Sequence, residues 1–383
     1  MLDCEKLYED NKSKHKKRKY IQLQKQGIVN INLKEELFDA GGIVKALNDI
    51  DYVIKTYKRA CKKIIFVCNK FQPADKLTYI LLETMIYDLI INKGYDVAIN
   101  LRNCRPGIDT EGINDSSILH INDLKNNIGR YKRKFAFEQS KTHFRRLLTK
   151  EQSEGIGMST LLGELKTFFL TSDLKKENTD QLAEMISELV DNVGDHTEAD
   201  CLIDIDISQS NYKKVGDETG EYIAVNAVVF NLGDKRLCDD VREKIENHYF
   251  DKSDRYELVE TAYNSHKSFF DKNYNEEDFF NIVSFQDGIS GRKGETATGG
   301  TGLTQLMKSL EANADDHGYY VMSGNRGLYF LPELLEYNED NWLGFNQQKD
   351  FLTARPDAKV FLKSNAFICG TAYNFTLIYR RDM

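Results

Sequence analysis

The stretch QLAEMISELVDNVGDHTEA, residues 181–199, carries the clearest pattern in this sequence. Apolar residues recur in it at helical spacing and predict one buried face, made of Leu182, Met185, Ile186, Leu189 and Val193. Glu188, Asn192 and Asp195 follow one another at i, i+4 and i+7 on a different face. The predicted helix therefore presents a carboxylate, an amide and a second carboxylate in one row.

This polar row suits the hydrolysis of a magnesium-bound nucleotide. A carboxylate can orient and deprotonate an attacking water, and an amide oxygen is a hard ligand of the kind that Mg²⁺ accepts. The alternative is an amphipathic helix with an ordinary solvated face, and the helix taken alone favours that alternative. Three later segments, in a particular order along the chain, favour the first interpretation.

Each of the three segments places small or polar residues at the end of a predicted element. Asn231 and Gly233 end the β-like run VVFNLGD, where a side chain that recognises a base could lie. The run TGGTGL, residues 298–303, opens a predicted helix, and glycines there let backbone N–H groups approach phosphates. Thr371 begins the final strand and places a hydroxyl where it could support a bound base.

The four features, in this order, resemble the GHKL superfamily, which includes DNA gyrase B subunits, MutL proteins, the large heat-shock ATPases and sensor histidine kinases. The resemblance covers about residues 155–383. ELVDNVGDHTEA is similar to the family's N box, which implies that Glu188 is the catalytic general base and Asn192 the magnesium ligand. Asp191 and Asp195 match positions that are commonly acidic in the gyrase and MutL versions. The resemblance thus implies ATP and Mg²⁺ as cofactors.

The other motifs imply the remaining nucleotide contacts. NLGD resembles the G1 box, with Asn231 in place of the usual aspartate, and an asparagine carbonyl can still accept a bond from the adenine amino group. Gly233 belongs to the same box, and Thr371 is implied to support the adenine site. GGTGL resembles the G2 box beside the triphosphate, which implies contacts from Gly299, Gly300, Thr301, Gly302 and Leu303.

The expected fold class is α/β (α+β). For residues 155–383 the resemblance implies a GHKL (Bergerat) two-layer sandwich, with helices on one face of a mixed sheet. It also implies an ATP lid inserted at 234–298, from which Arg292 or Lys293 would reach the phosphates.

The N-terminal part predicts a small α/β domain over residues 20–125, because strands alternate there with helices. We expect strands at 28–33, 63–68 and 96–102, and helices at 42–62 and 76–94. This alternation is similar to STAS-like domains, which occur with GHKL kinases in bacterial regulatory switches. A basic flexible N-terminus at 1–19 precedes the domain, and a basic linker at 126–154 follows it.

Composition excludes several classes of protein. The 383 residues carry a net charge of -8, so a global attraction to nucleic acid is not expected, and any contact would be local, through 12–19 or 130–134. The chain has no apolar run near the roughly 20 residues of a membrane span and no signal-peptide core, which predicts a cytoplasmic protein. Seven scattered cysteines predict neither a zinc site nor a disulfide framework.

Three functions remain open at this point. The first is an ATPase that drives or reports a conformational switch in a regulatory or defence complex, with a protein partner or as a homodimer. The second is a protein kinase of the histidine or anti-sigma type. His143 is its upstream candidate phosphoacceptor, although the surroundings favour an ordinary histidine on a surface helix, and His196 favours a packing role. The third is a scaffold that senses nucleotide without hydrolysing it.

Overall fold

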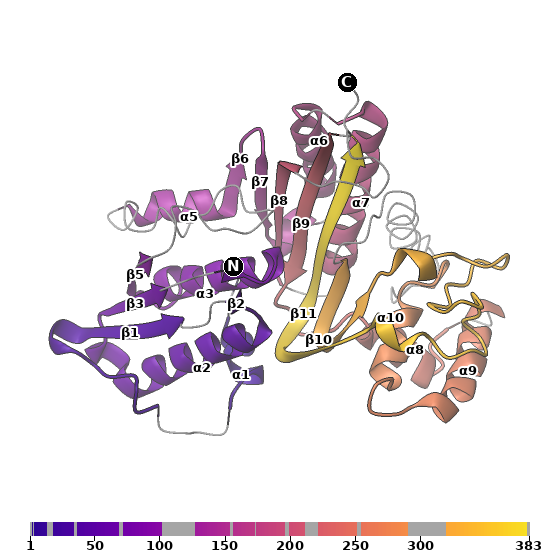
Figure 1. Cartoon of the computed structure of the whole chain (residues 1–383), viewed down its shortest axis with the longest axis horizontal. Coiled ribbons are helices and arrows are strands. Elements are labelled where there is room, and N and C mark those ends of the chain that lie inside the picture. Colours follow the sequence, from indigo (N-terminus) through magenta and orange to yellow (C-terminus); the bar gives the residue numbers. More distant parts are fainter. Residues whose placement is uncertain are drawn as a thin grey trace.

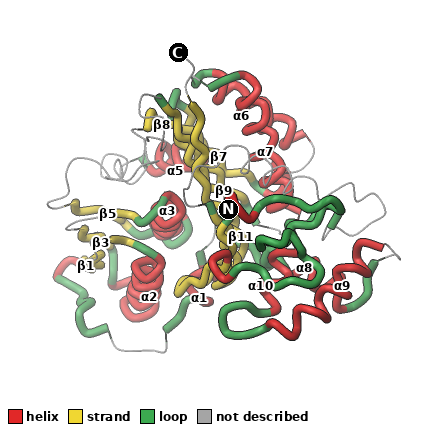
Figure 2. The backbone as a smooth tube through the Cα atoms, turned by 45° about the vertical axis from the view of Figure 1, so that its right-hand side comes forward, coloured by secondary structure: helices red, strands yellow, loops and turns green. Residues whose placement is uncertain are grey.

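The computed structural model describes residues 2, 4–13, 18–33, 37–68, 72–101, 127–153, 156–172, 174–195, 199–210, 221–250, 254–289 and 319–380. These residues form four layers (Figures 1 and 2): a three-stranded sheet, a helical layer, a six-stranded sheet and a second helical layer. The architecture is α+β, as expected from the sequence. No described helix is long and apolar enough to cross a membrane.

The N-terminal layers follow the predicted alternation of strands and helices. Strands β1 (Ile28–Leu33), β3 (Lys63–Cys68) and β5 (Asp96–Leu101) form a parallel sheet in the order β1-β3-β5. The helices between them are α2 (Ala40–Tyr57) and α3 (Lys76–Ile91), and the short strands β2 (Leu37–Phe38) and β4 (Gln72–Pro73) pair beside them. Asp39 and Asp75 cap the two helices by accepting bonds from backbone N–H groups of the first turn.

The C-terminal part is built on the six-stranded sheet. Its strands are β6 (Phe137–Gln139), β7 (His143–Leu148), β8 (Cys201–Ser210), β9 (Tyr222–Asn231), β10 (Tyr320–Tyr329) and β11 (Phe361–Arg380). They lie in the order β10-β11-β9-β8-β7-β6, and each pairing is antiparallel. The expectation of a mixed sheet is therefore wrong for the described strands. Antiparallel neighbours need only a short return of the chain, as between β6 and β7.

One face of this sheet carries the second helical layer. The helices are α6 (Ile156–Leu170), α7 (Lys176–Asp195), α8 (Asp239–Glu246), α9 (Asp254–His266) and α10 (Glu276–Val283). The predicted apolar stripe of α7 is confirmed for Leu182, Met185, Ile186 and Leu189, which are all buried in the core. The side chain of Val193 lies outside the described residues.

The opposite face of the same sheet is covered by a helix from outside residues 155–383. Helix α3 packs against β9 and β11 on that face (Figure 2), and its residues Lys76–Leu89 are all buried. Buried side chains, most of them apolar, lie on every side of α3, and such a helix must find partners all round. Helix α3 has such partners because it lies between the two sheets.

The segment 126–154 is structured, in contrast to the expected linker. It contains α5 (Ile128–Ala136), β6, β7 and the short 3₁₀ helix Lys150–Ser153. Its many basic residues obscure a pattern of buried apolar residues. Tyr131 and Phe135 of α5 are buried, as are Phe144 and Leu148 of β7. The linker was predicted from the charged residues alone, and these do not show which apolar side chains are buried.

The N-terminal segment also differs from expectation. Residues Glu5–Asp10 form α1, and Leu7 and Tyr8 of this helix are buried. Asn11 joins it to the distant strand β11, since its Nδ2 donates to the carbonyl oxygen of Phe367 at 2.8 Å. The described part of 1–19 is therefore anchored to the sheet rather than flexible.

The interval 234–298 is the predicted ATP lid. Its described residues, 234–250 and 254–289, hold α8, α9 and α10, which pack together beside β10. Phe279 and Phe280 of α10 are buried in the same core as α7. These residues form a packed helical unit because aromatic side chains recur among their charges.

Candidate functional site

Three polar side chains form a row across three neighbouring strands. They are Asn231 of β9, Thr371 of β11 and Ser323 of β10, and all three are buried. Asn231 ends β9, but Thr371 lies in the middle of β11, so the prediction that it begins the final strand is wrong. The backbone N–H of Thr371 donates to Asn231 Oδ1 at 3.0 Å, and the Oγ atoms of Ser323 and Thr371 lie 3.5 Å apart. Ser323 also donates to the carbonyl oxygen of Gly370 at 2.8 Å. We call Asn231, Thr371 and Ser323 the polar row.

The polar row lies on the sheet face that α7 covers. Strand residues alternate between faces, so Asn231 shares its face with Val229, and Thr371 shares its face with Tyr373. Val229 and Tyr373 belong to the same core as the apolar stripe of α7. The structure thus brings the G1-like segment and the final-strand segment together on the face of the predicted N-box helix.

Gly370 allows Asn231 and the backbone of Thr371 to come close enough for their hydrogen bond. A Cβ at this position would lie 1.9 Å from Asn231 Oδ1 and 2.9 Å from the backbone nitrogen of Gly233. Any side chain would therefore push the end of β9 away from the middle of β11. This contact explains why a glycine precedes Thr371.

Asn231 makes a contact that the resemblance does not imply. Its Oδ1, which was expected to meet an adenine amino group, accepts a hydrogen bond from the backbone N–H of Thr371. This bond joins the end of β9 to the middle of β11.

Two members of the predicted catalytic row have described side chains on α7. Glu188 is exposed and Asn192 is half-buried one turn later. Asp195 is the last residue of the helix, and its side chain lies outside the described residues. The G2-like residues Gly299, Gly300, Thr301, Gly302 and Leu303 also lie outside them, as do Arg292, Lys293 and His196.

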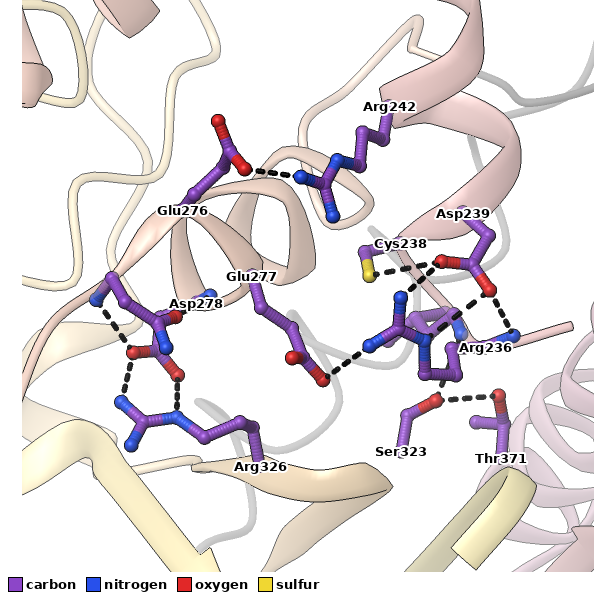
Figure 3. Close-up of polar contacts among 12 residues, drawn as sticks. Arg236, Cys238, Asp239, Arg242, Glu276, Glu277, Asp278, Ser323, Arg326 and Thr371 are labelled. Atoms are coloured by element: carbon purple, nitrogen blue, oxygen red, sulfur yellow. Dashed lines mark hydrogen bonds and ion pairs between the residues drawn. The ribbon is translucent and has the colours of Figure 1, made fainter.

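Ion pairs fasten the helical unit α8–α10 beside the polar row (Figure 3). Arg236 Nη1 lies 3.1 Å from Glu277 Oε1, and Arg236 Nη2 lies 2.8 Å from Asp239 Oδ1. Arg326 of β10 pairs with Asp278, which is buried in the first turn of α10. Burial raises the pKa of Glu277, and the neighbouring Asp278 carboxylate adds to this, against the attraction of Arg236.

This network of ion pairs could not be predicted from the sequence, because its members come from three separate segments. A bond from the backbone N–H of Leu237 to Ser323 Oγ, at 2.9 Å, links the network to the polar row. The unusual density of Arg, Asp and Glu around 236–246 and 276–278 was a signal that could have suggested ion pairing, but not the identity of the partners.

A second polar cluster is buried between α3 and the opposite face of the six-stranded sheet. Its members are Lys76 and Glu83 of α3, His143 and Arg145 of β7, and Asp204 and Asp206 of β8, which we call the ionic cluster. Lys76 Nζ lies 2.6 Å from Asp204 Oδ1 and also pairs with Asp206. Arg145 Nε lies 2.5 Å from Asp204 Oδ2, and its guanidinium also pairs with Glu83.

The register of the strands brings these charges together. Arg145 is directly opposite Asp204 and His143 is directly opposite Asp206 in the β7–β8 pairing. Burial by itself would raise the pKa of Asp204, but Arg145, Lys76 and His143 hold that pKa well below its usual range. Burial raises the pKa of Asp206, and Lys76 only partly opposes this.

The ionic cluster does not have the arrangement of a metal site. Ligand atoms of His143, Asp204 and Asp206 lie within 4.8 Å of one another. However, the ammonium group of Lys76 already contacts both aspartates and occupies the position of a cation. The cluster is therefore a structural link between the N-terminal layers and the six-stranded sheet.

His143 is not the surface helix histidine that its surroundings predicted. It begins strand β7, is buried, and its Nε2 lies 3.1 Å from Asp204 Oδ2. A phosphoryl donor could reach this ring only if the ionic cluster opened. The position argues against His143 as a phosphoacceptor.

The described cysteines are buried in the two cores. They are Cys4, Cys61, Cys68, Cys201, Cys238 and Cys369. They act as small apolar side chains of the two cores.

Comparison with known proteins found no match to this chain. No family model matches the chain, and no curated protein or solved structure matches it either. The functional argument therefore depends on the residues and their geometry.

Proposed function

We propose that this protein binds Mg-ATP between the C-terminal end of α7 and the polar row, and hydrolyses it. The single observation that supports the proposal most is the convergence of separate motif segments. Asn231 and Thr371 are 140 positions apart in the sequence but are hydrogen-bonded on the sheet face that α7 covers. The GHKL resemblance requires this proximity of the G1 and final-strand motifs to the N-box helix.

The proposal gives each side chain a distinct task. Glu188, which is exposed on α7, orients a water molecule and accepts its proton. Asn192 lies one turn later, and its amide oxygen would hold Mg²⁺, which supplies positive charge to the phosphates. The polar row supports the base, with Thr371 and Ser323 offering hydroxyl groups beside Asn231. The donor set of one carboxylate, one amide and two hydroxyls is chemically suited to this ligand.

The first experiment measures Mg-ATP binding by titration calorimetry and turnover by phosphate release. We expect Glu188→Gln to bind ATP with little change but to lose about 10²- to 10⁴-fold in kcat, because the general base is absent. We expect Asn192→Ala to lose the Mg²⁺ dependence of binding. Glu188 is exposed and Asn192 is half-buried, so neither change removes a fully buried side chain and both variants should fold.

Glu184→Gln is the matched control. Glu184 lies one turn before Glu188 on α7, is also exposed, and pairs with Lys166 at 3.2 Å. Its replacement removes the same carboxylate chemistry outside the proposed site and should leave kcat unchanged. Absence of any Mg-ATP binding by the wild type, or equal losses in the Glu184 and Glu188 variants, would refute the proposal.

The same measurements separate the two other functions. Binding without turnover in both wild type and the Glu188 variant indicates a nucleotide-sensing scaffold. Transfer of labelled phosphate to the protein or to a co-purifying partner indicates a kinase. Burial of His143 in the ionic cluster is the observation that makes the histidine-kinase alternative the weaker one.

A further inference from the structure

The positive charge of this acidic protein is concentrated in one segment. Residues 127–150 contain eight Lys and Arg side chains but only one acidic residue, Glu138, whereas the whole chain has a net charge of -8. The segment forms α5 and the β6–β7 hairpin. A local positive field therefore lies on one part of a molecule that is otherwise acidic.

The apolar side of α5 is already used. Tyr131 and Phe135 are buried, and the Phe135 ring stacks on Tyr87 of α3 with 4.0 Å between ring centroids. The opposite side of the helix is left exposed and carries Arg130, Lys132 and Arg133. We call these three residues the basic ridge.

The basic ridge has no counter-charge within the described part of the chain. Other cations of the segment do have one: Arg146 lies 3.3 Å from Glu164, and Arg145 belongs to the ionic cluster. No ion pair or hydrogen bond joins the side chain of Arg130, Lys132 or Arg133 to a described residue, although the backbone N–H of Arg130 donates to Asn127 Oδ1 at 2.9 Å. No described acidic side chain therefore neutralises these three charges.

The other basic segment, 12–19, differs in this respect. Lys12 Nζ lies 3.2 Å from Glu9 Oε1, and Arg18 Nη1 lies 2.5 Å from the buried carboxylate of Asp49. These two cations are therefore occupied inside the protein. Lys19 is the one described cation of 12–19 with no such partner, whereas all three members of the basic ridge have none, which favours the basic ridge.

We propose that the basic ridge binds the phosphodiester backbone of nucleic acid without regard to sequence. Guanidinium groups match phosphate geometry with paired N–H donors, and two of the three side chains are arginines. A membrane surface fits less well, because an interfacial helix inserts its apolar face and α5 buries that face against α3. This proposal is independent of ATP binding.

The number of phosphate contacts sets how strongly salt should weaken binding to nucleic acid. Three phosphate contacts give a slope of about -2.7 for log affinity against log salt on duplex DNA, or about a 40-fold loss between 50 and 200 mM salt. Binding should therefore be weak at physiological salt and readily detected at low salt.

The test is fluorescence anisotropy of a labelled DNA duplex with the full chain, without nucleotide, over a series of salt concentrations. We expect the triple variant R130Q/K132Q/R133Q to bind weakly and to have a salt slope smaller in magnitude by about two to three. The control K25Q/K58Q/R59Q removes three exposed cations of the N-terminal layers, and therefore the same net charge. It should retain wild-type affinity and slope, with circular dichroism confirming that both variants fold.

Three outcomes would overturn the proposal. They are absence of duplex binding at 50 mM salt, equal losses in the ridge and control variants, and binding to anionic lipid vesicles or polyglutamate as tight as binding to the duplex. Because ATP is absent from the assay, failure here leaves the proposed ATPase function untouched, and the reverse also holds.

Discussion

Both faces of the six-stranded sheet are buried, but by different chemistry. On β8, Ile203, Ile205 and Ile207 enter the apolar core beneath α6 and α7. The alternate residues Asp204 and Asp206 enter the ionic cluster beneath α3. One strand thus supplies an apolar contact to one layer and a charged contact to the other.

The difference concerns how tightly each layer is positioned. Apolar contacts are non-directional, so a helix such as α7 can shift slightly without losing most of its burial energy. Buried ion pairs are favourable only in a good geometry, because each charge has lost its water. We infer that the ionic cluster sets the orientation of the N-terminal layers on the sheet, while the α7 side tolerates the small movements that ligand binding requires.

Replacement of Asp204 by alanine should have the largest effect on stability, and it tests the charged face of the sheet. The change leaves Lys76 and Arg145 buried without their shared carboxylate, and loss of one partner from a buried ion pair costs about 3–5 kcal/mol. Urea unfolding followed by circular dichroism measures the change. A loss below about 1 kcal/mol would mean that the ionic cluster does not hold the layers together.

On the apolar face, Leu189→Ala should destabilise the protein by about 2–5 kcal/mol, in the range of buried leucines in other cores. The cost comes from lost burial and a cavity, so it should not vary with salt concentration. The Asp204→Ala cost, in contrast, involves charges. Unfolding of both variants at two salt concentrations compares the faces directly, and an equal salt response would contradict the distinction.

Gly370→Ala should cost about 1–3 kcal/mol through overpacking. The added methyl group would overlap Asn231 Oδ1 and must separate the end of β9 from the middle of β11. We also expect weaker Mg-ATP binding, because the polar row is displaced. Gly163→Ala is a suitable control, since no atom lies within 4 Å of a Cβ at that exposed helical position; an equal effect of both changes would exclude the close contact as the cause.

The pH dependence should be the smallest effect, because protonation removes a charge but no side chain. The pKa of Asp204 is depressed in the folded state, so its contribution is present above the unfolded pKa of about 3.9 and is lost as the pH falls further. The raised pKa of Asp206 acts in the opposite sense, since the folded state then holds its proton more readily.

Acid titration of wild type and Asp204→Asn isolates the contribution of Asp204 to stability. The wild type should lose stability below about pH 4 more steeply than the variant, which has no carboxylate at this position. Parallel acid unfolding curves for the two proteins would show that Asp204 is not held ionised by its neighbours.

Much of the local structure was predictable, and the failures have identifiable causes. The strands β1 and β3 and the helix α7 were expected within a few residues of their bounds. Strand β10 was missed because Gly324 and Gly327 interrupt it, and glycine disfavours a strand. Gly324 has a φ of 65° at a register shift, and a Cβ at Gly327 would lie 2.2 Å from the carbonyl oxygen of Val321.

The candidate site was predictable in its segments but not in its contacts. Glu188 and Asn192 share one side of α7 because of helical spacing alone. The bond from Thr371 to Asn231 could not be predicted from spacing, and neither could the close approach that requires Gly370. The ion pairs of Arg236 and Arg326 were missed for the same reason.

Periodicity along the chain was enough to place the apolar stripe of α7 and the alternating strands of the N-terminal part, because these depend on neighbours a few residues away. The same alternation in LIDIDI, residues 202–207, places Asp204 and Asp206 on one face but does not say what covers that face. Lys76, which compensates Asp206, is 130 positions away in the sequence. Burial of a charge depends on a partner brought close by folding, and no local pattern contains that partner.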